Sequence, residues 1–138
     1  MPAEVRDELV ARLGPFPLFR FWGPAADITA SRWIADATLH VLEQNRYGLV
    51  LTYLPHLDYD HQRFGPASPE GQRALSAVDL QAGRLIDGAQ AAGMRVAVLS
   101  DYAFEPVSRP IFLNRALRSA GLLAVQRAAN GELLEPGA

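Results

Sequence analysis

The sequence predicts an α/β fold with a parallel-sheet core built from βαβ crossovers. Two short apolar runs, at residues 49–54 and 95–100, have the near-continuous pattern of strands that are buried on both faces. A single long amphipathic helix pattern separates them. A strand, a helix and a second strand in this order form a right-handed crossover, so we expect the two strands to be adjacent and parallel.

The helix between these runs has clear signals at both ends. Ser68 is a good N-cap, Pro69 occupies the first helical position and Glu70 lies in the first turn. Gly93 is expected to end the helix. One face stays apolar over four turns, through Leu75, Val78, Ala82, Leu85, Ile86 and Ala89.

Two further helices are predicted before the first apolar run. Residues 4–13 form a short helix that ends at Gly14-Pro15, and residues 31–45 repeat apolar side chains at helical spacing. Either Thr29 or Ser31 is expected to cap the second helix.

The C-terminal part of the sequence predicts a short helix at 114–120 and a strand at 122–125. Asn130-Gly131 is a turn signal that would fold residues 132–134 back as a hairpin.

Length, charge and hydropathy limit the number of domains and the classes of partner that this sequence could have. Residues 1–138 suffice for a single α/β domain or a fragment of a larger one, and few helices are available to cover the strands. We therefore expect either a partial sheet or a homo-oligomer. The net charge of -2, without any block of like charge, argues against a nucleic-acid partner. A charged N-terminus and the lack of a run of about 20 apolar residues predict a cytoplasmic protein without a membrane partner.

Chemistry-bearing side chains follow both predicted strands. Segment 55–66 comes after the first strand and segment 100–102 after the second. In an open parallel sheet, ligands bind beyond the carboxyl ends of the strands, so both segments would reach one edge. Carboxylates with imidazoles suit zinc, manganese or iron. The side chains that could converge there are Asp58, Asp101, His61, His56 and Asp60.

Simpler interpretations exist for the same residues. Polar loops commonly follow strands. The Asp101 side chain could simply cap the next turn and bind no metal. His40 lies near the apolar face of a predicted helix, where packing is the more frequent role. Arginines such as Arg115 and Arg118 more often lie in solvent on a helix than on a phosphate.

The two segments carry a family resemblance. Residues 53–59 with 62–66 resemble the loop of type I phosphodiesterases and nucleotide pyrophosphatases, which belong to the alkaline phosphatase superfamily. Val98-Leu99-Ser100-Asp101-Tyr102 resembles the family's strand and Ser-Asp-His motif. Residues 110–125 and the stretch 14–24 resemble one subgroup, so the resemblance covers most of the chain. It implies an alkaline-phosphatase-like fold and a pair of divalent metals, zinc or manganese.

The sequence departs from the family pattern at two ligand positions. Aligned on Gly65-Pro66, the family's histidine falls on Gln62, and His61 is one residue early. The histidine of Ser-Asp-His is Tyr102. By resemblance, the nucleophilic threonine or serine would precede this chain and a further metal-binding histidine would follow it. The catalytic residue is therefore unknown, and we expect the isolated chain to have an incomplete site.

Two functional hypotheses follow from the resemblance. The first is a metal-dependent hydrolase of small phosphate or phosphonate esters, with Asp58 and Asp101 as metal ligands and His61 or His56 next. The second is a non-catalytic relative that keeps the fold and binds a ligand or partner. Metal content separates the two.

Overall fold

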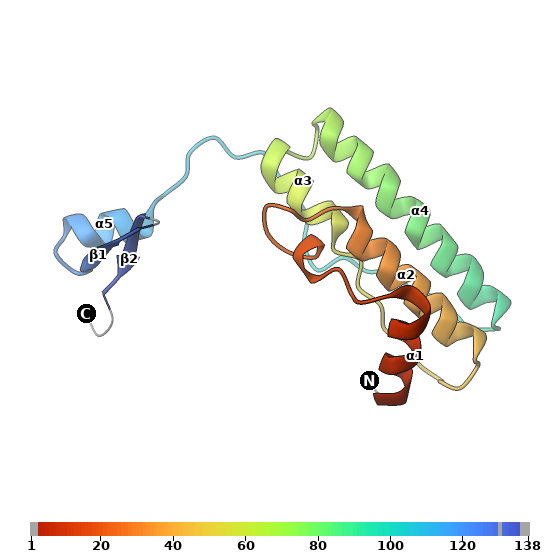
Figure 1. The fold of residues 1–138 in the computed structure, drawn as a ribbon. Helices are drawn as coiled ribbons and strands as arrows, with labels where there is room; N and C mark the ends of the chain where they lie inside the picture. Colours follow the sequence, from red (N-terminus) through yellow and green to blue (C-terminus); the bar gives the residue numbers. More distant parts are fainter. Residues whose placement is uncertain (1–2, 130, 136–138) are drawn as a thin grey trace. The chain divides into compact units, whose positions relative to one another are not determined.

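The computed structural model describes residues 3–129 and 131–135 and divides the chain into two compact units, Met1–Pro106 and Val107–Ala138. The order of elements is shown in Figure 1. The prediction that residues 1–138 form one domain, or part of one, remains a prediction.

The first unit is built mainly of helices. It contains α1 (Ala3–Leu13), the 3-10 turn η1 (Leu18–Arg20), α2 (Ile28–Glu43), α3 (His56–Phe64) and α4 (Pro69–Ala91). α2 and α3 both pack against α4, and α1 packs against α2 (Figure 1). The helices predicted at 4–13, 31–45 and after Ser68 are confirmed, although α2 begins three residues earlier than predicted.

The start of α2 is capped by a residue other than the two predicted ones. Asp27 has an extended backbone, and its carboxylate accepts a hydrogen bond of 2.8 Å from the Thr29 amide. Arg20 holds the other oxygen of Asp27 at 3.0 Å. The prediction of Thr29 or Ser31 as the cap is wrong, because Ser31 is fully buried within the helix.

The start of α4 agrees with the prediction. The Ser68 hydroxyl accepts a hydrogen bond of 2.9 Å from the Gly71 amide and donates one of 2.7 Å to the Gly65 carbonyl. Pro69 is the first helical residue. Ser68 thereby caps α4 and also ties it to the end of α3.

A small apolar core joins α1 to α2. Val5 and Leu9 of α1 are buried against Ala37 of α2, with Leu13, Trp33 and Val41 packed around them. At one side of this core His40 contacts Glu8 at 2.9 Å, and its side chain is only 11% exposed. The expectation that His40 serves packing rather than chemistry is consistent with this position.

The two apolar runs form extended loops in this structure. Residues 49–54 and 95–100 contain no strand, and among the described residues their backbone groups make no backbone–backbone hydrogen bonds. Leu51 and Leu99 are 85% and 90% exposed. The predicted parallel sheet is therefore not present in residues 3–129 and 131–135. A strand in a parallel sheet needs hydrogen-bonded neighbouring strands, and the described residues supply none to either run.

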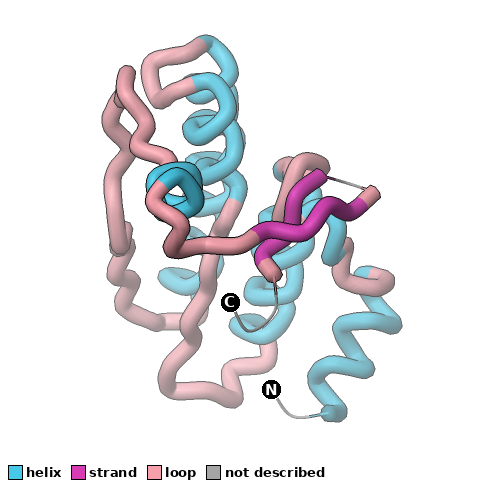
Figure 2. The backbone as a smooth tube through the Cα atoms, turned by 90° about the vertical axis from the view of Figure 1, so that its left-hand side faces the viewer, coloured by secondary structure: helices cyan, strands magenta, loops and turns pink. Residues whose placement is uncertain are grey.

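The second unit contains α5 (Leu113–Ser119) and the strands β1 (Val125–Ala128) and β2 (Gly131–Leu134). The strands pair antiparallel, with Val125 opposite Leu134. They are the magenta segments in Figure 2. The helix and the hairpin confirm the predictions, although β1 begins three residues later than the strand predicted at 122–125. Asn130 of the predicted turn lies outside the described residues.

None of the described helices combines the length and the apolar character that crossing a membrane requires.

Candidate functional site

The polar segment after the first apolar run folds as a helix. The sequence pattern predicted a loop at 55–66, but residues His56–Phe64 form α3. Gly65 ends this helix with a φ of 87°, a backbone conformation that glycine adopts without strain, and its amide donates to the His61 carbonyl at 2.9 Å. Pro55 and Gly65 were available as start and stop signals around a helix of this length.

This helix separates the candidate side chains by position. Residues three apart on a helix lie on neighbouring positions of one face, whereas residues two apart do not face each other. Asp58 and His61 therefore share a side of α3, and His56 lies on another. The helix allows Asp58 and His61 to serve one site and places His56 elsewhere.

Asp58 is joined to the second candidate segment through Tyr102. The Tyr102 hydroxyl donates a hydrogen bond of 2.5 Å to Oδ2 of Asp58, across 44 residues of sequence. This bond raises the pKa of Tyr102 above its ordinary value, because the nearby carboxylate stabilises the protonated phenol. The two segments expected to meet at one edge therefore do meet at this point.

The charges of Asp58 and Asp101 both act on the phenol of Tyr53. Burial raises the pKa of the Tyr53 phenol, and the negative charges of Asp58 and Asp101 raise it further. Both carboxylates thus lie close enough to Tyr53 to influence its ionisation. Asp58 and Asp101 as metal ligands remain a prediction, but their charges act on the same neighbouring phenol.

His61 of α3 packs against the segment that follows Tyr102. Its ring lies edge-on to Phe104 with centroids 5.3 Å apart, and Phe104 lies 5.5 Å from the Tyr102 ring. Nδ1 of His61 is buried and has no hydrogen-bond partner among the described residues. His61 is therefore near the Asp58–Tyr102 pair, with aromatic contacts on one side.

His56 lies in a different environment. Its amide donates to the hydroxyl of Ser31 at 3.2 Å, which anchors the start of α3 on α2. Burial lowers the pKa of the His56 imidazole, while the charges of Asp60 and Asp27 act in the opposite direction. These neighbours differ from those of Asp58.

The described residues do not by themselves fit a metal centre. No group of three or more histidine, aspartate or glutamate side chains in residues 3–129 and 131–135 is arranged to hold a metal ion. Asp58 and Asp101 offer two carboxylates, which are fewer protein ligands than the three or four found in zinc sites. One oxygen of Asp58 is also engaged by Tyr102.

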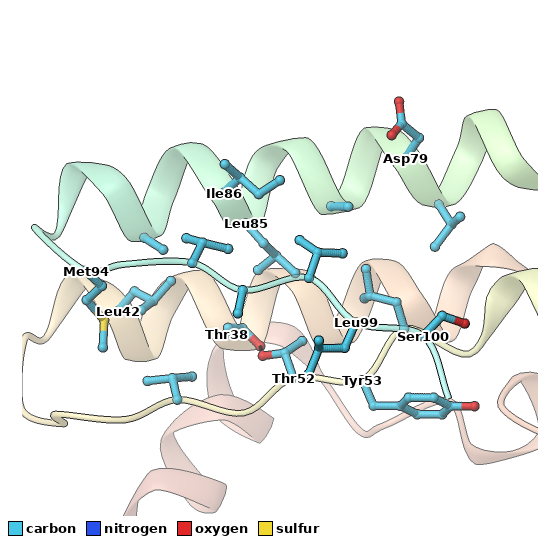
Figure 3. Close-up of a pocket in the computed structure, with 18 of the residues that line it drawn as sticks. Thr38, Leu42, Thr52, Tyr53, Asp79, Leu85, Ile86, Met94, Leu99 and Ser100 are labelled. Atoms are coloured by element: carbon cyan, nitrogen blue, oxygen red, sulfur yellow. Dashed lines mark hydrogen bonds between the residues drawn. The ribbon is translucent and has the colours of Figure 1, made fainter. Parts of the chain in front are cut away.

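The candidate side chains line a pocket of about 1100 Å³, which includes Asp58, His61, Asp101 and Tyr102. Residues of α2, α3, α4 and the two extended segments form its walls, and Figure 3 shows part of this lining. Apolar side chains such as Leu42, Leu85 and Met94 line much of the pocket. In Figure 3, Leu42 and Met94 lie at the left, and Tyr53 and Ser100 lie at the right. Tyr53 and Phe104 were not predicted from the sequence, because their role depends on contacts between distant segments.

Comparison with known proteins decides the family. The family model for type I phosphodiesterase / nucleotide pyrophosphatase matches residues 2–138. The chain belongs to this family. The resemblance inferred from the motifs is confirmed. The family is generally metal-dependent and acts on phosphate esters.

One curated relative is an uncharacterized pyrophosphatase/phosphodiesterase of Schizosaccharomyces pombe. It is 34% identical over 74 residues, which is 51% of this chain and 15% of the relative. The matching part thus spans about one seventh of the relative's length. No solved structure matches this phosphodiesterase-family chain.

Proposed function

We propose that this protein is a metal-dependent hydrolase of phosphate or phosphonate esters, in which Asp58 and Asp101 are metal ligands. His61 is the next candidate, because it shares a side of α3 with Asp58. His56 ranks below it, because its neighbours are Asp60 and Asp27. Zinc or manganese is the proposed metal, since carboxylate and imidazole groups suit both.

The observation that carries this proposal is the meeting of two distant segments at the Asp58–Tyr102 hydrogen bond. It brings together the two motifs that suggested a phosphodiesterase, and family membership supplies the reaction class. The proposal includes a parallel, alkaline-phosphatase-like sheet in which residues 49–54 and 95–100 become strands. We also propose a cytoplasmic location, which cell fractionation of the full polypeptide tests.

An aryl phosphodiester assay on the full polypeptide encoded by the gene tests the function. We expect turnover with added zinc or manganese that falls by at least about 10- to 100-fold in D58A and in D101A, because even groups that only orient a metal ligand contribute that much. Asp87 is an exposed carboxylate of α4, and D87A is the matched control. Full activity in both D58A and D101A would refute the assignment of these ligands.

A second candidate function is that of a non-catalytic relative that binds a ligand at the same place. The hydrogen bond from Tyr102 to Asp58 favours it, because that bond occupies an oxygen that a metal would use. Metal analysis of the purified full polypeptide separates the two candidates. A stoichiometric divalent ion supports the hydrolase, and a protein that stays metal-free after incubation with zinc and manganese supports the binding role.

A further inference from the structure

Arg63 of α3 is surrounded by oxygen acceptors of its own chain. Its Nη2 donates to the carbonyl oxygens of Gly23 and Pro24, each at 3.0 Å. Its Nη1 donates to the Ala26 carbonyl at 3.3 Å and to Oδ1 of Asp60 at 3.0 Å. These two nitrogens carry four hydrogens, and the four acceptors account for all of them. The guanidinium is therefore engaged by the protein itself and is not offered to a substrate phosphate.

The three carbonyl groups belong to a closed turn that directly precedes α2. The Asp27 amide donates to the Arg20 carbonyl at 3.1 Å, and the Arg20 guanidinium holds the Asp27 carboxylate at 3.0 Å. Asp27 in turn caps α2. Residues 20–27, which we call turn 20–27, are thus fixed to the start of α2 by their own contacts. Arg63 reaches an acceptor surface that is already in place.

These bonds attach the end of α3, the helix that carries two candidate side chains. At the beginning of α3, the His56 amide donates to the Ser31 hydroxyl of α2 at 3.2 Å. Arg63 lies in the last turn of α3, as does His61. Asp58 and His61 therefore lie between the two attachments, and a movement of the last turn would displace His61 directly.

The guanidinium group suits this contact better than another cation would. The side chains of Arg63 and Asp60 are only 29% and 24% exposed, and the guanidinium carbon lies 5.3 Å from the centre of the Tyr59 ring. Hydrogen bonds from a charged donor are stronger than neutral ones, and a planar guanidinium directs several of them at once. A lysine would keep the charge and lose the fork that meets four acceptors.

We propose that Arg63 is a positioning residue of the candidate site: its guanidinium clamps the last turn of α3 onto turn 20–27 and thereby keeps His61 against Phe104 and Asp58 against Tyr102. The catalytic consequence of this clamp rests on the proposed function. Its geometric consequence is measured without turnover, so a failure of the phosphodiesterase proposal is distinguishable from a failure of the clamp.

The first test follows the contact between α3 and the later segment by NMR, on the full polypeptide encoded by the gene. The wild type should show a nuclear Overhauser effect between the rings of His61 and Phe104, whose centroids lie 5.3 Å apart. R63A should lose this effect and keep the helical amide signals of α3. Added guanidinium ion should restore the effect, because it supplies the missing donors to the same carbonyl groups.

The second test measures aryl phosphodiester hydrolysis by the same proteins. R63A should lower kcat by roughly 10- to 100-fold and change KM by less than about threefold, because a displaced group costs rate even where substrate still binds. Guanidinium ion should recover part of the loss. R73A is the matched control for both tests and should resemble the wild type, because the Arg73 side chain is 68% exposed and pairs with Glu70 within α4.

The variant R63K covers the case in which R63A fails to fold. It keeps the charge and most of the apolar stem, so it should fold and show a weaker His61–Phe104 effect than the wild type. An undiminished effect in R63K or R63A would overturn the clamp, whatever the turnover. An unchanged kcat in an R63A variant that has lost the effect would overturn its role in positioning the site. A wild type without turnover would refute the proposed function and leave the NMR result to decide the clamp.

Discussion

Gly71 approaches Gly65 so closely that a Cβ atom on Gly71 would lie 2.9 Å from the Gly65 carbonyl oxygen. The same atom would lie 3.0 Å from Cδ2 of His61 and 3.2 Å from the Pro66 carbonyl. Two of these three neighbours are backbone atoms, which cannot rotate away. The junction of α3 and α4, which positions Asp58 and His61, therefore requires a glycine at residue 71.

The first prediction concerns this junction. Gly71→Ala should lower the free energy of unfolding by about 1–3 kcal/mol, because the added methyl group forces the backbone of the junction to shift. Gly83 lies in the same helix with open space around its α carbon. Gly83→Ala is the matched control and should raise stability by roughly 0.5–1 kcal/mol. Urea unfolding measures both, and a stabilised Gly71→Ala variant would show that the junction is loosely packed.

The second prediction concerns the cap of α4. Ser68→Ala removes the hydrogen bonds to the Gly71 amide and the Gly65 carbonyl, and it should cost about 1 kcal/mol, with an upper limit near 2. Ser76 donates to the Gln72 carbonyl within the helix. Because that carbonyl belongs to the helical backbone, Ser76→Ala should change stability by less than about 0.5 kcal/mol. Equal effects of the two substitutions in thermal unfolding would contradict the capping role.

The third prediction is a pH dependence that arises from His56. Burial holds the pKa of His56 below its ordinary value of 6.5, so the unfolded chain binds more protons than the folded chain just below that pH. The free energy of unfolding should therefore fall as the pH drops from 6.5 toward the folded-state pKa. His56→Gln removes the titration and should flatten this part of the profile. If the free energy of unfolding of the wild type rose on acidification through this range, and the His56→Gln variant gave the same pH profile, His56 would be excluded as the cause.

The fourth prediction concerns the isolated 138-residue chain. We expect negligible hydrolysis of an aryl phosphodiester even with added zinc or manganese, because the described residues hold no group of three metal-binding side chains. The substitutions at Gln62 and Tyr102 point the same way. The rate is compared with a no-enzyme control. Turnover well above that control, and lost in Asp58→Ala, would show that these residues form a working site.

Local sequence signals were sufficient for several elements. Ser68, Pro69 and the apolar periodicity identified α4, and Asn130-Gly131 identified the hairpin of β1 and β2. Each of these signals acts within a few residues, through caps and turns that the local chain itself completes. The motifs around Asp58 and Asp101 likewise indicate the family, and the match over residues 2–138 confirms it.

The sequence by itself thus determined where α4 starts, that a hairpin follows α5 and which family the chain belongs to. The tertiary structure decided how residues 49–54 and 95–100 are used and what Asp58 contacts. An apolar run becomes a strand only when a neighbouring strand supplies backbone hydrogen bonds, and the described residues supply no backbone hydrogen bond to either run. Asp58 meets Tyr102 across 44 residues of sequence, and only packing of α3 against the later segment brings that phenol to that carboxylate.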